Sequence, residues 1–139
     1  MLRNRGVPET WRAGLIEVAP KVFAFVQATG ETGISNAGLI VGGEAAIAVD
    51  ALMVPSMTRR FVAAIKKATR KALGHLINTH HHLDHTGGNR FFRAAAFISH
   101  AKCREALAPG FPSLPLLQRF MPRFAQEFPL LKVVLPTVT

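Results

Sequence analysis

The chain has 139 residues, of which 49% are hydrophobic and 18% are charged. This length suits one domain and excludes a collagen and a multidomain protein, and this share of apolar residues excludes a wholly disordered chain. Its 17 lysines and arginines outnumber its 8 aspartates and glutamates, so the formal net charge is +9, which suits an anionic partner.

The first part of the chain is predicted to form strands. Apolar residues recur with a period near two over residues 14–18 and 22–26, which predicts two short strands separated by a Pro-Lys turn. Two apolar runs, 37–41 and 45–49, flank a pair of glycines and predict a hairpin. Both strands of this hairpin are apolar throughout, so we expect them to be buried.

An amphipathic helix is predicted from Pro55 to about Leu73, ended by Gly74. Six of the seventeen basic residues lie between Arg59 and Lys71, opposite the apolar side of this helix. We interpret them as the solvated outer face of a helix that covers a sheet. Contact with nucleic acid is the alternative, which we do not favour because no aromatic residues interleave with these charges.

Strands and helices are predicted to alternate in the next part of the chain. A strand over 75–79 leads into a histidine-rich turn, and a helix at 90–93, a strand at 95–98 and a helix at 100–107 follow. Such alternation predicts an α/β protein with a mixed sheet and covering helices.

The last part of the chain is predicted to hold one more helix and one more strand. A proline-rich loop precedes a helix over 116–128, which Pro122 bends or splits. The apolar run 130–135 predicts a final strand.

Four of the six histidines lie in one short segment directly after the strand at 75–79. In extended backbone His80 and His82 point to the same side, while His81 points away. A turn after His82 brings Asp84 and His85 to the same cavity. Imidazole nitrogens and a carboxylate suit zinc, and also iron or manganese, so we expect a metal site.

The segment resembles the metallo-β-lactamase superfamily, whose signature His-x-His-x-Asp-His is present as His80, His82, Asp84 and His85. The hairpin before it resembles the family hairpin that ends in an aspartate near the metals, here Asp50. The resemblance covers about residues 18–107 and implies half of an αββα sandwich.

Carried over residue by residue, the resemblance implies that His80 and His82 bind a first metal ion and that Asp84 and His85 bind a second. Asp50 supports a ligand without touching a metal. In the family a hydroxide held by the metals, most often zinc, attacks a carbonyl or phosphoryl centre, and the motif aspartate helps to transfer the proton.

Complete family members have a second half that supplies two more histidines and a bridging aspartate, which this sequence lacks. After His85 the next histidine is His100, near Cys103, and Asp84 is the last aspartate. We interpret His100 and Cys103 as structural rather than as a replacement metal pair. Residues 1–139 are therefore expected to form a single, truncated domain, covered by self-association or by a complementing C-terminal half.

The resemblance implies a zinc-dependent hydrolase of a small ester, thioester, lactone or lactam. One alternative is a nuclease or phosphodiesterase of the same superfamily, which the net charge favours. Another is a non-catalytic metal-binding or interaction module that pairs with a chain carrying the remaining ligands.

No membrane span or secretion signal is predicted. The most apolar window, residues 37–55, carries Glu44 and Asp50, and the basic N-terminus lacks a following apolar stretch. The single cysteine excludes an internal disulfide. These features predict a cytoplasmic protein.

Overall fold

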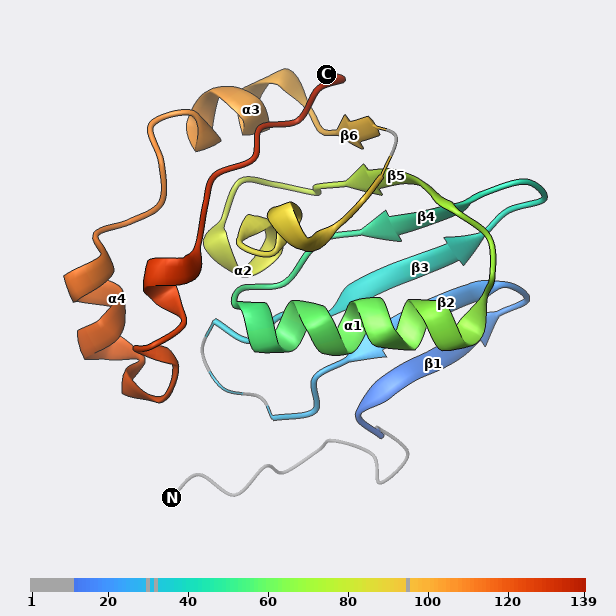
Figure 1. Cartoon of the computed structure of the whole chain (residues 1–139), viewed down its shortest axis with the longest axis horizontal. Coiled ribbons are helices and arrows are strands. Elements are labelled where there is room, and N and C mark those ends of the chain that lie inside the picture. The colour runs from blue at the N-terminus through green and yellow to red at the C-terminus, as the bar shows by residue number, and fades with distance from the viewer. Residues whose placement is uncertain (1–11, 30, 32, 95) are drawn as a thin grey trace.

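One mixed sheet forms the centre of the fold (Figure 1). The structure is a computed structural model that describes residues 12–29, 31, 33–94 and 96–139. Over these residues the sheet has six strands in sequence order: β1 (Gly14–Ala19), β2 (Val22–Val26), β3 (Ala37–Val41), β4 (Ala46–Val49), β5 (Leu73–Ile77) and β6 (Ala96–Ile98). The first four strands are antiparallel, and β5 and β6 continue the sheet in parallel with β4. The predicted mixed α/β architecture is confirmed.

Helices and 3-10 turns connect and flank these strands. They are α1 (Pro55–Ala68), α2 (Leu83–Thr86), η1 (Asn89–Phe91), α3 (Ala101–Leu107), α4 (Leu114–Phe120), η2 (Pro122–Phe124) and η3 (Phe128–Leu130). The longest of them, α1, lies across one face of the sheet, and α3 and α4 lie toward one side of the molecule (Figure 1). No helix in the described ranges is long and apolar enough to span a membrane.

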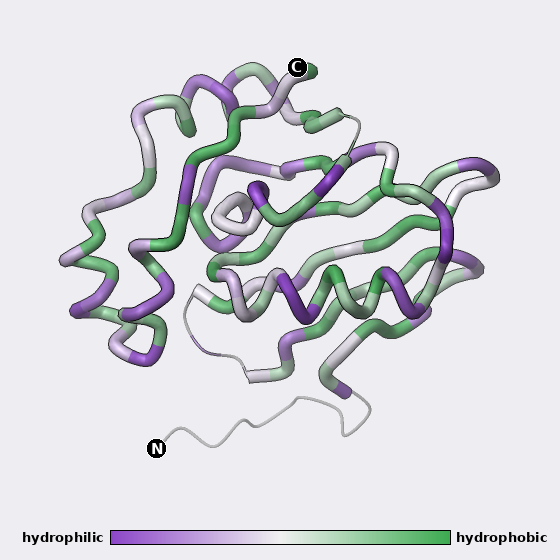
Figure 2. The backbone as a smooth tube through the Cα atoms, viewed as in Figure 1, coloured by the Kyte–Doolittle hydropathy of each residue, from purple (hydrophilic) through white to green (hydrophobic). Residues whose placement is uncertain are grey.

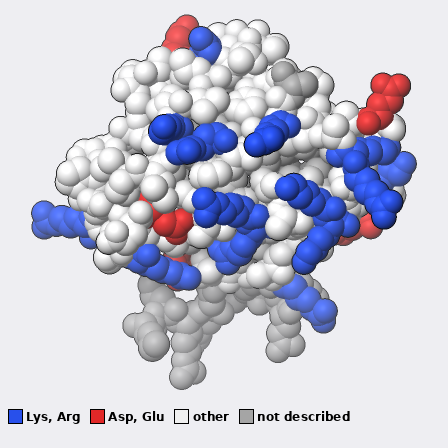
Figure 3. Space-filling model, in the orientation of Figure 1, with Lys and Arg blue, Asp and Glu red and all other residues white. Residues whose placement is uncertain are grey.

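Helix α1 follows from the spacing of its apolar residues. Pro55 occupies its first turn, and Met57, Phe61 and Ile65 recur at four-residue intervals and are buried. Lys66 and Lys67 lie in the last turn, where cations interact favourably with the helix dipole. The basic residues stay on the outer side, and Figure 3 shows them gathered over this side of the molecule.

The helix ends earlier than predicted. Its last residue is Ala68, because Thr69 is already extended at φ −151° and ψ 148°. Gly74 therefore does not end the helix but lies inside β5, whose first residue Leu73 pairs with Ala46 of β4. Pairing with a buried strand outweighs the local helical pattern in this stretch.

The predicted elements near the C-terminus need larger corrections. The strand predicted at 130–135 is wrong: η3 ends at Leu130, and the sheet edge at Ile98 forms one isolated parallel bridge with Val138. The predicted split at Pro122 is confirmed, because proline lacks an N–H donor for an α-helix, but the two pieces are α4, which begins at Leu114, and the 3-10 turn η2. The segment predicted as a helix at 90–93 forms the 3-10 turn η1.

The hydrophobic core lies between the sheet and α1. Phe61 is fully buried, and its ring centroid lies 4.9 Å from that of Phe25 on β2 and 5.9 Å from that of Phe92. Leu39 and Leu76 complete the sheet side of this contact and are fully buried as well. Figure 2 shows the apolar colouring of the strands behind α1.

The other face of the sheet is also apolar, but it does not belong to this core. Alternate strand residues point away from the buried side chains, and their positions are half-buried or exposed, with Ile40 40% exposed. The registers align them in rows across the strands. These residues are Ile16, Ala24, Ile40, Ile47, Val49, Ile77 and Ile98. We call this surface the open sheet face.

Candidate metal centre

Two neighbouring parallel strands bring the candidate residues to one edge of the sheet. Asp50 directly follows β4, and Thr79 follows β5 by two residues. The carboxyl ends of parallel strands meet at the same edge. The carboxylate of Asp50 accepts hydrogen bonds from the backbone N–H of Thr79 at 2.8 Å and from its hydroxyl at 2.8 Å. The loops after both strands are thereby joined where the histidine motif begins.

Asp50 is buried and has a left-handed backbone at φ 61°. Aspartate tolerates this conformation better than most residues. Its Oδ2 also lies 2.8 Å from Nδ1 of His85. One carboxylate therefore orients both the start of the motif and its last histidine.

The structure brings the imidazoles of the motif together. The ring centroid of His80 lies 4.1 Å from that of His85 and 4.7 Å from that of His82. Asp84 completes the group, with its Oδ2 3.2 Å from Nε2 of His85. His81 is exposed, and its ring centroid is 6.5 Å from that of His80.

Electrostatics in this group follow from the position of His85 between two carboxylates. The hydrogen bond to Asp50, and next that to Asp84, raises the pKa of His85 to about 9. The same hydrogen bond to His85 lowers the pKa of Asp84. Burial, followed by repulsion from His85 and His82, lowers the pKa of His80. At neutral pH His85 is therefore a cation shared by Asp50 and Asp84.

The short helix α2 and Gly88 hold the motif against the loop after β4. The turn expected after His82 is the helix α2, in which the N–H groups of His85 and Thr86 donate to the carbonyl of His82 at 3.0 and 3.1 Å. The carbonyl of His85 accepts from the N–H of Ala51 at 2.8 Å, and the N–H of Gly88 donates to the carbonyl of Leu52 at 3.0 Å.

Two buried asparagines stabilise this arrangement through hydrogen bonds. The side-chain amides of Asn78 and Asn89 donate to each other's oxygens at 2.9 and 2.8 Å. Asn78 also reaches the carbonyl of His85 at 3.3 Å, and Asn89 reaches that of Val134 at 3.1 Å. Satisfied buried networks of this kind rigidify the elements they join.

Sequence reasoning missed three supporting residues. Thr79 holds Asp50, Asn78 holds the carbonyl of His85, and the hydroxyl of Ser35 donates to the carbonyl of Asp84. Ser35 is 49 positions away from Asp84, so no local pattern signals the contact. Asn78 and Thr79 fell inside the strand predicted over 75–79, and their polar side chains at its end were the one available signal.

His100 and Cys103 lie at the start of α3. His100 precedes α3, and its Nδ1 accepts from the N–H of Lys102 at 3.1 Å, which caps the helix. Cys103 is buried one turn further along α3. His100 thus caps α3 and Cys103 is buried, and the interpretation of both as structural stays a prediction.

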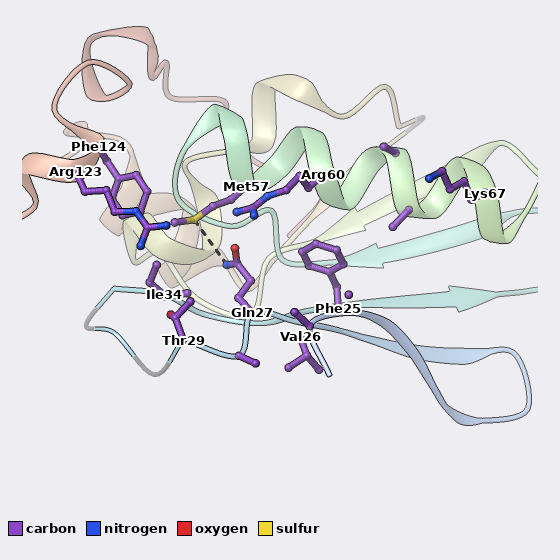
Figure 4. Close-up of a pocket in the computed structure, with 15 residues that line it drawn as sticks. Phe25, Val26, Gln27, Thr29, Ile34, Met57, Arg60, Lys67, Arg123 and Phe124 are labelled. Carbon is purple, nitrogen blue, oxygen red and sulfur yellow. Dashed lines mark hydrogen bonds between the residues drawn. The ribbon is translucent and has the colours of Figure 1, made fainter. Parts of the chain in front are cut away.

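A separate hollow of about 480 Å³ lies between α1 and the end of β2 (Figure 4). Phe25, Met57 and Phe124 contribute apolar walls, and Arg60 and Arg123 lie along it. No histidine of the motif lines this hollow. Its size suits part of a small molecule.

The chemistry of the motif residues fits a metal ion. Three imidazoles and one carboxylate are the ligand types of zinc, and Asp50 lies against Nδ1 of His85, where a carboxylate would orient the ring of a ligating histidine. The described residues contain no group of three or more His, Cys, Asp or Glu side chains already spaced to hold an ion. Both ring nitrogens of His85 face carboxylates instead, so a metal held by His85 would have to replace a proton on the ring.

Comparison with known proteins places this chain in a family. The family model of the metallo-beta-lactamase superfamily matches residues 30–136. A metallo-beta-lactamase structure from Erythrobacter litoralis, with beta-mercaptoethanol in its active site, is 29% identical with a TM-score of 0.55, covering 68% of this chain and 44% of its own.

Two further structures share the fold at lower identity. A metallo-beta-lactamase motif mutant from Cronobacter sakazakii is 20% identical with a TM-score of 0.56, covering 71% of this chain and 39% of its own. A beta-lactamase domain protein from Burkholderia ambifaria is 17% identical with a TM-score of 0.58, covering 73% and 36%. The chain thus spans less than half the length of these structures. With the family model matching most of its residues, the chain belongs to the metallo-β-lactamase superfamily.

Proposed function

We propose that this chain carries the metal-binding half-site of a hydrolase that acts on a small ester, thioester, lactone or lactam. The observation that carries the proposal is the gathering of His80, His82, Asp84 and His85 at the carboxyl edge of β5, with Asp50 orienting His85 at 2.8 Å. Membership of the superfamily supplies the hydrolytic chemistry.

The residues divide into ligands and a support. His80, His82, Asp84 and His85 are the proposed ligands, and zinc is the metal that imidazole and carboxylate together favour, with iron and manganese as alternatives. Asp50 is the proposed support, because its carboxylate is buried and already accepts from Thr79.

A metal ion bound there supplies Lewis acidity and lowers the pKa of water. The chain's own residues orient the proposed ligands. Asp50 fixes the ring of His85, and the buried amides of Asn78 and Asn89 keep the motif backbone in place. Asp84, whose side chain is 28% exposed, is the residue we assign to proton transfer with solvent.

Acyl substrates are favoured over phosphodiesters by the Erythrobacter litoralis structure, which is named a metallo-beta-lactamase and is 29% identical. A nuclease or phosphodiesterase is the second candidate, supported by the net charge of +9. A non-catalytic metal-binding module is the third.

A second protein layer on the open sheet face is part of the proposal. Two β-sheets pack face to face at about 10 Å when both present apolar side chains, as Ile40, Ile47 and Ile77 do here. A second copy of the chain or a complementing half supplies such a layer. Either occupant is expected to be needed for two metals to be held in register.

The test combines metal content with particle size. The chain is purified without chelator, and zinc, iron and manganese per chain are measured on the fraction whose mass is determined by light scattering. We expect bound metal, and hydrolysis of at least one lactam, lactone or thioester that a chelator abolishes and zinc restores. Metal well below one ion per chain, in every size fraction and after zinc is added, would contradict the half-site.

The support role of Asp50 makes a separate prediction. Asp50→Asn is expected to weaken metal binding about 10-fold to 100-fold, as loss of a group behind a ligand does. Asp84→Asn is expected to weaken it more, because it removes a ligand charge. Apparent zinc affinity by competition with a chromophoric chelator measures both. A larger loss for Asp50→Asn than for Asp84→Asn would reject the division of roles.

A further inference from the structure

Exposed cations cover the outer side of α1 and the turn beside it (Figure 3). We call this surface the cationic face. It consists of Arg59, Arg60, Lys66 and Lys67 of α1, Arg70 just after it, Arg90 of η1 and Arg93. Among the described residues none of the seven takes part in an ion pair. Their charge is therefore available to a ligand.

An aromatic ring lies among these cations. Phe91 of η1 is half-buried, and the guanidinium carbon of Arg59 lies 5.4 Å from its ring centroid, while that of Arg90 lies 5.2 Å from it. Along the sequence no aromatic residue interleaves with the charges of α1. The packing of η1 beside α1 supplies one from 32 positions away (91 minus 59).

A hollow of about 260 Å³ opens on the same face. Its walls are apolar and include Val62, Ile65 and Phe92. Lys66 and Arg93 lie at this hollow with Lys71, whose ammonium group donates to the carbonyls of Gly42 and Gly43. The hollow thus combines an apolar interior with two exposed cations.

We propose that the cationic face binds single-stranded nucleic acid. Lysines and arginines pair with the phosphates, and planar guanidinium groups held against a ring also stack on bases. The apolar hollow beside Lys66 and Arg93 accepts an unstacked base, which a duplex does not offer. This surface is separate from the histidine motif, so the proposal does not depend on the proposed hydrolase.

An anionic membrane fits the same surface less well. Peripheral membrane helices insert large apolar side chains beside their cations. Of the large apolar residues exposed in the described parts of the chain, only Leu130 has a contact with this face, because its carbonyl accepts from Arg90 at 2.6 Å. The others are Val18, Ile40, Leu114, Leu116, Phe120 and Val138. On α1 the large apolar residues Phe61 and Ile65 are buried.

The test uses fluorescence anisotropy with a labelled 12-nucleotide single strand, as DNA and as RNA, over a range of monovalent salt. We expect log K to fall with log salt with a slope of about −2 or steeper, because single strands contribute about −0.7 per phosphate contact. An unlabelled duplex of the same sequence is expected to compete more weakly than the single strand.

Two double variants with the same change in net charge distinguish binding by the cationic face from a general effect of the net charge. Lys66→Glu with Arg93→Glu is expected to weaken binding about 25-fold at 0.1 M salt, the loss of about two phosphate contacts. Lys102→Glu with Arg119→Glu, on α3 and α4, is the control and is expected to change binding much less. Thermal unfolding checks that both variants remain folded.

The outcomes divide clearly. Equal weakening by the two double variants, or a slope near zero, would overturn the assignment of the face. Equal binding of duplex and single strand would overturn the role of the hollow, and binding to phosphatidylserine vesicles without binding to oligonucleotides would identify a lipid surface instead. His82→Ala is expected to leave oligonucleotide binding unchanged, so failure here is distinct from failure of the metal site.

Discussion

Replacing His82 by alanine is expected to reduce the metal bound per chain to background. His82 is the proposed ligand whose removal disturbs the fold least, because its side chain is exposed and α2 uses its backbone carbonyl rather than its ring. Loss of a group behind a ligand costs about 10-fold to 100-fold in metal affinity, and loss of the ligand itself is expected to cost more. Elemental analysis and chelator competition measure the effect.

His81→Ala is the matched control for this experiment. His81 is adjacent and equally an exposed histidine. Its ring centroid lies 4.8 Å from that of His82 but 6.5 Å from that of His80, whereas the ring of His82 lies 4.7 Å from that of His80. We expect its metal content and affinity to match the parent chain. Equal losses from the two variants would show that binding follows histidine number rather than the proposed ligand set.

Gly88→Ala is expected to destabilise the fold severely. A Cβ at this position would lie 2.1 Å from the carbonyl oxygen of Ala51 and 2.1 Å from the hydroxyl of Thr58. Both neighbours are fully buried, and Thr58 donates to that same carbonyl at 2.8 Å. The loop has little freedom to move, because Leu52 beside it already has a left-handed backbone at φ 65°.

The expected loss in the free energy of unfolding is about 3 kcal/mol or more, at or above the usual range for overpacking. Urea unfolding of the metal-free chain measures it without interference from metal binding. Gly43→Ala is the control: it lies in an exposed turn, and its Cβ would meet nothing within 4 Å. A loss for Gly88→Ala no larger than for Gly43→Ala would mean that the loop after β4 yields easily.

These two experiments test the proposed ligands and the scaffold of the same site separately. His82→Ala removes a proposed ligand and leaves the scaffold, while Gly88→Ala disturbs the contact between the motif and the loop that begins with Asp50. If Gly88→Ala folds after all, its metal affinity is expected to fall, because the carbonyl of His85 accepts from the N–H of Ala51 at 2.8 Å in that contact.

Local patterns in the sequence were sufficient for most strands, for α1 and for the histidine motif. The period of two in β2 and the four-residue spacing of Met57, Phe61 and Ile65 depend on neighbours in sequence, so they are visible without a structure. The same holds for the signature from His80 to His85, whose ligand types and spacing predicted the family.

Long-range pairing decided the rest. Pairing between Leu73 and Ala46 ended α1 early. The strand predicted at 130–135 is absent, and the edge of β6 that does not pair with β5 forms only an isolated bridge, with Val138, within the described chain. The local sequence signals neither of these pairings, because the free energy of joining distant segments depends on the whole sheet.

By itself, then, the sequence determined the mixed α/β class, the superfamily and the residues that are candidates for the metal. The tertiary structure alone decided that Asp50, Thr79 and His85 meet at one sheet edge and that Phe91 lies beside Arg59. The physical reason is the same for both of these contacts. Residue type and spacing act over one or two turns of chain, whereas hydrogen bonds and packing between segments form only when the sheet brings those segments together.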